Sequence, residues 1–93
     1  MNNPGFITTA QADRARAAVE ERLVERLKRA IDDNISENGY RPRTPVANYC
    51  KQIGLGIRIT PGAGAEYDTP DTRTLAHKID QSSMPSLLRR YFE

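Results

Sequence analysis

The stretch from Thr9 to Asn38 constrains the fold more than any other, because its apolar residues recur at helical spacing. Thr8 and Gln11 have the separation of a capping box, which predicts that a helix begins at Thr9. Gly39 suits the left-handed position at which many helices end. We interpret the following apolar positions as one face of an amphipathic helix: Ala15, Val19, Leu23, Val24, Leu27, Ala30, Ile31 and Ile35.

A helix this long does not fit inside a compact domain of 93 residues. Residues 9–38 span on the order of 43 Å, whereas a compact chain of this length has a radius of gyration of roughly 12 Å and a diameter of roughly 32 Å. The helix therefore either bends or frays at its alanine-rich start, or it projects and is covered by a partner. We expect projection and a homodimer, with self-association through Val19, Leu23, Leu27 and Ile31.

Residues 44–93 are expected to form the compact part of the molecule. "YRPRTP" is a linker with two prolines, and Thr44 is then expected to cap a second helix with Pro45 at its first position. Gly54 would end this helix. Its buried face would consist of Val46, Tyr49, Cys50 and Ile53.

The segment "GLGIRIT" changes to a period of two residues, which is typical of a strand. Ile57 and Ile59 would face one side, and a returning strand would place Ala65 and Tyr67 on the same side. We expect a small β-hairpin within residues 56–69, with an ordered loop as the alternative.

Two further short helices complete the prediction. Thr69 and Pro70 repeat the capping pattern of the second helix, and Ser82 or Ser83 is expected to cap the last helix, with Pro85 in its first turn. The apolar positions are Leu75, Ala76 and Ile79 in the third helix, and Met84, Leu87, Leu88 and Tyr91 in the fourth. The sequence thus predicts one mainly α-helical domain over residues 1–93: a loose lead-in over residues 1–8, the helix over residues 9–38, three short helices and the hairpin.

Composition narrows the setting in which the chain works. Residues 1–40 carry six Lys/Arg and seven Asp/Glu, a balance of −1, whereas residues 41–93 carry eight and five, a balance of +3. This surplus permits nucleic-acid binding without requiring it. The chain has one cysteine, no apolar run long enough to cross a bilayer, and no basic start with an apolar stretch as in a secretory signal. We therefore expect a cytoplasmic protein without membrane contact.

Chemistry at a catalytic or metal centre is not indicated. Cys50 and His77 are the only residues of their types, and Cys50 falls on an apolar helix face without a nucleophile motif around it. One cysteine and one histidine do not make a structural zinc site. The glycines between residues 54 and 64 lack the following helix and lysine of a phosphate-binding loop. We expect no enzymatic activity, no metal and no cofactor.

The last twenty residues, "TLAHKIDQSSMPSLLRRYFE", carry the one lead to a function. Leu75 and Ala76 resemble the Leu-Ala pair that holds the first helix of a helix-turn-helix against its core, and Ile79 resembles the apolar residue before the turn. Ser83, Leu87, Arg89 and Tyr91 follow the S-x-x-x-L-x-R-x-aromatic spacing of some bacterial activators. The stretch over residues 74–93 therefore resembles helix-turn-helix DNA-binding domains. The resemblance implies that these residues contact DNA: Arg73, Lys78, Ser83, Met84, Ser86, Arg89 and Arg90.

Two functions follow as expectations. The first is a small DNA-binding regulatory protein that dimerises through the long helix and meets double-stranded DNA with the C-terminal helix pair. The alternative is an adaptor or inhibitor of a larger protein, of the kind phages carry, which acts through the amphipathic helix without nucleic acid.

Overall fold

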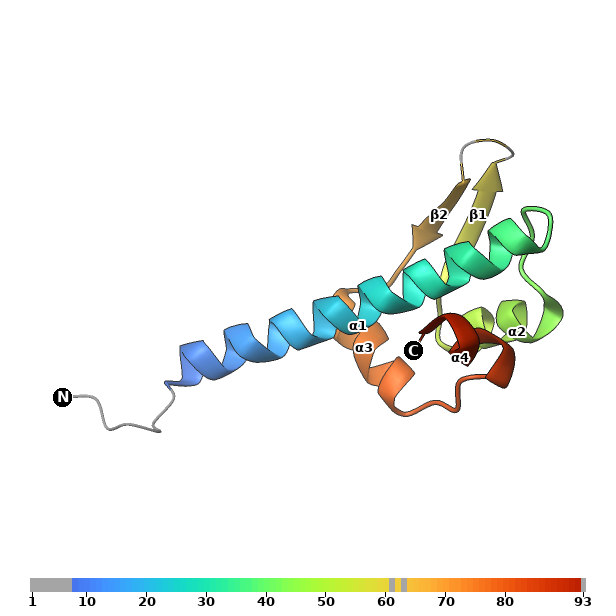
Figure 1. Cartoon of the computed structure of the whole chain (residues 1–93). Coiled ribbons are helices and arrows are strands. Elements are labelled where there is room, and N and C mark those ends of the chain that lie inside the picture. Colours follow the sequence, from blue (N-terminus) through green and yellow to red (C-terminus); the bar gives the residue numbers. More distant parts are fainter. Residues whose placement is uncertain (1–7, 61, 63, 93) are drawn as a thin grey trace.

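The predicted elements are present in a computed structural model, which describes residues 8–60, 62 and 64–92. The predicted lead-in falls almost entirely on residues 1–7, outside the described residues. The fold is mainly α-helical, with a long N-terminal helix, three short helices and one antiparallel hairpin (Figure 1). In chain order the elements are α1 (Thr9–Glu37), α2 (Thr44–Gln52), β1 (Gly56–Thr60), β2 (Gly64–Asp68), α3 (Thr72–Asp80) and α4 (Ser86–Phe92).

Helix α1 begins and ends with local interactions that the sequence encodes. The Thr8 hydroxyl accepts a hydrogen bond from the Gln11 amide, and the Gln11 side chain accepts one from the Thr8 amide, which completes the capping box. At the other end Gly39 has φ of 69°, and the Tyr40 amide donates to the Ile35 carbonyl at 2.8 Å. This is the long hydrogen bond of a Schellman ending.

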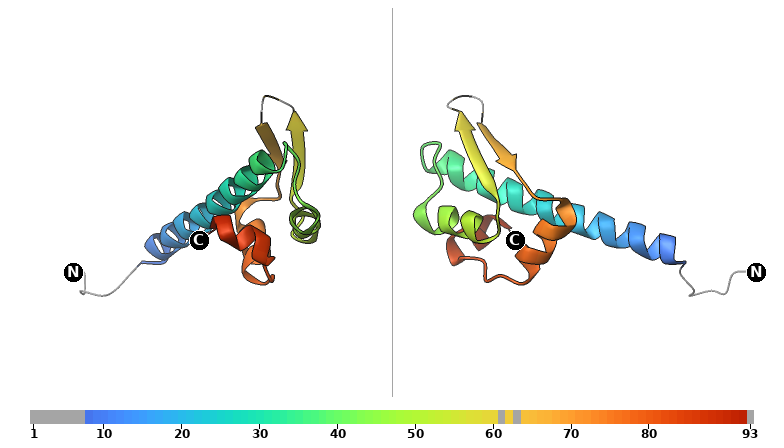
Figure 2. Two further views of the ribbon diagram at one scale, coloured as in Figure 1. Left: turned by 45° about the vertical axis from the view of Figure 1, so that its right-hand side comes forward. Right: turned by 180° about the vertical axis from the view of Figure 1, so that it is seen from behind.

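The helix runs without a break and reaches far beyond the other elements, as all three views show (Figures 1 and 2). The molecule measures 58 × 26 × 20 Å with a radius of gyration of 16.0 Å. A compact chain of this length would have about 12 Å. The expected projection is therefore confirmed, and the bent or frayed helix is not what the structure contains.

The apolar line of α1 does not stay on one face, and this explains the projection. A spacing of four residues advances about 400° around a helix, so each step turns the line by roughly 40°. Val19 and Ile31 are three such steps apart, which separates their directions by roughly 120°. Ile31 is fully buried, whereas Val19 is 62% exposed. The C-terminal half of the line faces the core and the N-terminal half turns away from it.

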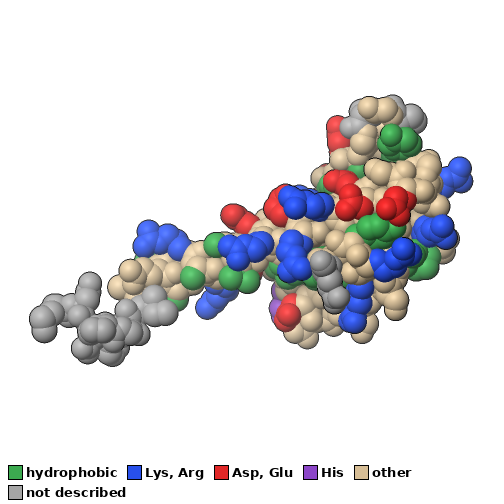
Figure 3. Space-filling model, viewed as in Figure 1, with side chains coloured by type: hydrophobic (Ala, Val, Ile, Leu, Met, Phe, Trp, Pro, Cys, Tyr) green, Lys and Arg blue, Asp and Glu red, His purple; other side chains and the backbone are tan. Residues whose placement is uncertain are grey.

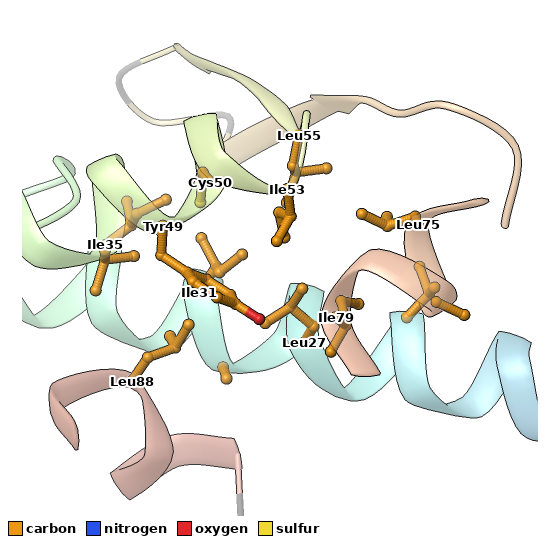
Figure 4. Close-up of a cluster of buried hydrophobic side chains, with 14 residues drawn as sticks. Leu27, Ile31, Ile35, Tyr49, Cys50, Ile53, Leu55, Leu75, Ile79 and Leu88 are labelled. Atoms are coloured by element: carbon orange, nitrogen blue, oxygen red, sulfur yellow. The ribbon is translucent and has the colours of Figure 1, made fainter. Parts of the chain in front are cut away.

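The core lies between the C-terminal half of α1 and the short elements (Figure 4). Helices α3 and α4 both pack on α1, and α2 packs on α4 and β1. Leu27 and Ile31 are fully buried in this core, so their predicted place at a self-association face is wrong. The buried residues are Val24, Leu27, Ala30, Ile31, Ile35, Val46, Tyr49, Cys50, Ile53, Leu55, Leu75, Ala76, Ile79 and Leu88.

Three of the predicted helix caps are displaced. Arg43, not Thr44, is the N-cap of α2 and makes no side-chain capping bond, although a proline does lie in the first turn. Asp71, not Thr69, caps α3, because its carboxylate accepts hydrogen bonds from the amide and hydroxyl of Thr74. These two bonds hold the pKa of Asp71 below its usual value.

The third displaced helix cap is that of α4. The Pro85 carbonyl accepts from the Leu88 and Arg89 amides, which places Pro85 at the N-cap instead of within the first turn. The Ser82 hydroxyl donates to the Ile79 carbonyl at the end of α3, so it closes α3 and does not cap α4. The Tyr49 hydroxyl lies 2.5 Å from Ser82 Oγ and donates to it, because the serine proton is already used. This bond ties α2 to the end of α3.

The hairpin has the predicted strands and facing. Ile57 pairs with Tyr67, and Ile59 pairs with Ala65. All four side chains pack against the core. The Tyr67 hydroxyl also donates to the Asp32 carboxylate and lies 3.2 Å from the Lys28 carbonyl oxygen, which holds β2 against α1.

Candidate nucleic-acid interface

Helix α4 presents its polar residues on the side opposite its buried anchor. Leu88 is fully buried, whereas Ser86, Arg89 and Arg90 are exposed. At about 100° per residue these three lie within an arc of roughly 100°, and Leu88 points the other way. Figure 3 shows basic side chains gathered around α4 on the visible face of the molecule. A short basic helix face of this kind can meet phosphates or the edges of guanine.

The other residues predicted to contact DNA lie on α3 and in the segment before α4. Arg73 is exposed and lines a pocket between α1 and the start of α3, which it shares with Arg16 and with the acidic residues Asp13, Glu20 and Glu21. Lys78 Nζ lies 3.4 Å from the position that a Cβ on Gly54 would occupy, at the C-terminal end of α2. A cation is favourable at that end of a helix.

The remaining two candidates lie in the segment before α4. Ser83 is exposed there, as the prediction requires. Met84 is half-buried and packs against the core.

The spacing of α3 and α4 differs from a standard helix-turn-helix. Residues 81–85 make a five-residue connection, whereas the motif joins its helices by three or four residues, often with a glycine. Both helices pack chiefly on α1. The α3–α4 pair thus has a longer connection than the motif and is held mainly by α1.

A pocket of about 320 Å³ lies beside α4, where the end of α1 meets the start of α2, and we call it the α1–α4 pocket. Arg43 and Arg90 line it together with Glu37. The Tyr91 hydroxyl donates to the Glu37 carboxylate. This bond raises the pKa of Tyr91, while the nearby Arg90 and Arg43 act in the opposite direction. The full lining is Asn34, Glu37, Asn38, Arg43, Leu87, Arg90 and Tyr91.

The pocket contains two residues that sequence reasoning missed. Asn34 is only 1% exposed, and its Oδ1 accepts a hydrogen bond from the Arg43 amide at 3.2 Å. The sequence could have predicted its burial, because Asn34 lies three residues after Ile31 and seven after Leu27 and so shares their buried face of the helix. Arg43 had no such signal, since its nearness to Arg90 arises only in the folded chain.

The projecting half of α1 carries the remaining self-association candidates. Val19 is exposed, and Leu23 is half-buried at the edge of the core. Ala12, Ala15, Val19 and Leu23 lie within an arc of roughly 80°. Further along α1, one side of the helix faces the core. In the projecting half the same side is charged, because it carries Asp13, Arg16 and Glu20, which line the pocket with α3. This half therefore has a narrow apolar line and a polar side toward its own chain.

Cys50 and His77 do not form a reactive pair. Cys50 is buried, and burial raises the pKa of its thiol to about 11, so the thiol is protonated at neutral pH. His77 is exposed on α3. Among the residues that the structure describes, no three His, Cys, Asp or Glu side chains gather as a metal site would require.

Within residues 8–60, 62 and 64–92, no helix is both long and apolar enough to cross a bilayer.

Comparison with known proteins gives no relative of this chain. The sequence matches no family model, and comparisons with curated proteins and with solved structures gave no significant match.

Proposed function

We propose that this protein is a small DNA-binding regulatory protein that meets duplex DNA with the exposed face of α4. The observation that carries the proposal is the arrangement of Ser86, Arg89 and Arg90 opposite the buried Leu88. Leu88 fixes the helix on the core while the polar face stays free. The projecting half of α1 would supply the contact between two copies, through the line that contains Val19.

The test is binding of a labelled duplex, measured by fluorescence anisotropy over a range of salt concentrations. Contacts to phosphates release counterions, so the affinity is expected to fall steeply as salt rises. Replacing Arg89 and Arg90 by Gln should weaken binding and reduce the slope of log K against log salt by about 2.

The matched control removes the same charge from other elements, with Arg14→Gln and Arg58→Gln. Arg58 forms an exposed ion pair with Glu66 on the hairpin, and Arg14 is exposed on α1. If both double variants lose the same affinity, the contact is general attraction and the α4 proposal fails. Absence of duplex binding at low salt would also exclude it.

The second candidate is an adaptor or inhibitor that binds another protein through the projecting half of α1. Val19 is 62% exposed and lies one helical turn after Ala15. This exposure favours the second candidate, because an apolar line on a helix can lie against a groove or another helix. The double change Ala15→Glu and Val19→Asp should abolish association, as measured by light scattering for self-association and by co-purification for a foreign partner. Retention of both after the double change would exclude this surface.

A further inference from the structure

We propose that the α1–α4 pocket binds a phosphate group, and that in the DNA complex it holds a backbone phosphate beside the α4 face. The assignment to DNA rests on the function proposed above, whereas the phosphate site stands on the pocket itself. The pocket volume of about 320 Å³ is at the lower end of the range for small ligands.

Two guanidinium groups supply the charge. Arg43 comes from the start of α2 and Arg90 from α4, so the pocket joins basic residues 47 positions apart in the sequence. Each guanidinium carries five N–H donors in a planar fork that fits the oxygens of phosphate. Glu37 is the one carboxylate in the lining, and the hydrogen bond from Tyr91 already occupies it. The net charge of the lining favours an anion.

Asn34 is a buried polar residue in the wall of the same pocket. Its Oδ1 is used by the Arg43 amide, which fixes the orientation of the side-chain amide. Among the described residues, every fully buried side-chain polar atom has a hydrogen-bond partner. Asn34 lines the pocket, so its hydrogen bond fixes the Arg43 backbone at the pocket wall. A buried side chain that holds the Arg43 backbone in place distinguishes this pocket from two unsupported surface arginines.

The helix ends around the pocket are compatible with an anion. Arg43 is the N-cap of α2, so the positive end of that helix lies at the pocket. The C-terminal end of α1 also lies there, but its Asn34 and Ile35 carbonyls accept hydrogen bonds from the Asn38 and Tyr40 amides. These hydrogen bonds partly offset the negative charge at the C-terminal end of α1, which would otherwise disfavour an anion.

The test is an NMR titration of the whole chain with inorganic phosphate, with chloride at equal ionic strength as the reference. We expect saturating shifts at the Arg43 and Arg90 Nε–H groups and at the Asn34 side-chain amide. Arg43→Gln and Arg90→Gln should each weaken phosphate binding about tenfold. Arg41→Gln is the matched control, because Arg41 is exposed, lies two residues from Arg43 and does not line the pocket.

The outcomes separate this site from the proposed function. Shifts that do not saturate, or an equal loss in Arg41→Gln, overturn the pocket. Saturating phosphate binding without any duplex binding keeps the pocket and overturns the DNA proposal. Where duplex binding is present, Arg43→Gln should lower its salt slope by about 1. An unchanged slope would show that the pocket does not hold a backbone phosphate.

Discussion

The two halves of α1 have the same backbone geometry and opposite surroundings. Residues 24–35 include six buried side chains, among them the fully buried Leu27 and Ile31. Residues 9–22 include none, and only Ala12 and Glu20 are half-buried. The difference teaches that helical spacing alone does not decide which residues are covered. A line of residues four apart turns about the helix, so one continuous apolar line serves the core at one end and solvent at the other.

Hydrogen exchange should show the largest difference between the halves. An isolated helix of about 14 residues is marginal in water, so amides of residues 12–19 should open almost freely. Amides of residues 27–35 should exchange mainly by global unfolding, and hence at least about a thousandfold more slowly. Exchange followed by NMR or mass spectrometry on the same sample measures both. Equal protection would mean that the projecting half is covered in solution, which would point to a partner or a second copy.

Replacing one apolar residue by alanine in each half of α1 should change the free energy of unfolding by very different amounts. Leu27→Ala leaves a cavity in the core and should lower the free energy of unfolding by about 2–5 kcal/mol. Val19→Ala, at an exposed position, should change it by less than about 0.5 kcal/mol. Urea unfolding measures both values. A loss of more than about 1 kcal/mol for Val19→Ala would contradict the description of this half as uncovered.

Alkaline pH should destabilise the core around residues 24–35 and leave residues 9–22 unaffected. The Cys50 thiol packs in the core around that half, and burial raises its pKa from 9.0 to about 11. The folded state therefore binds the proton more tightly than the unfolded state, so this contribution is complete below pH 9 and is lost as the pH rises through about 11. The loss is on the order of 2 kcal/mol. Thermal unfolding measured between pH 8 and pH 11 tests it, and Cys50→Ala should reduce the pH dependence. An unchanged dependence in that variant would assign it to other groups.

The hairpin contact should give a smaller effect than the changes at Leu27 and Cys50. Tyr67→Phe removes the hydroxyl that donates to Asp32 on the covered half of α1. We expect a loss of about 1 kcal/mol in the free energy of unfolding, with the ring still packed on the core. The same measurement on Tyr40→Phe is the control, because Tyr40 is 52% exposed. A larger loss for Tyr40→Phe would reverse the assignment of the two tyrosines.

Much of the site depended on contacts that no local pattern encodes. The exposed face of α4 could be predicted, since Arg89, Arg90 and Leu88 are close in the sequence. The surroundings of Arg73 and Met84 could not be predicted, because the pocket neighbours of Arg73 come mainly from α1 and the core contact of Met84 arises only in the folded chain. The α1–α4 pocket was missed entirely, because its lining comes from three helices.

The sequence by itself determined where α1 starts and stops, that α2, α3 and α4 follow it, and that a hairpin lies between α2 and α3. These features depend on neighbours within a few residues: the capping box at Thr8, the left-handed Gly39, and the alternation of Ile57 and Ile59. Only the tertiary structure decided which part of the apolar line is covered and which arginines meet at one pocket. Local hydrogen bonds and periodicity fix the backbone of an element, whereas burial and electrostatic environment depend on the residues that distant elements bring to it.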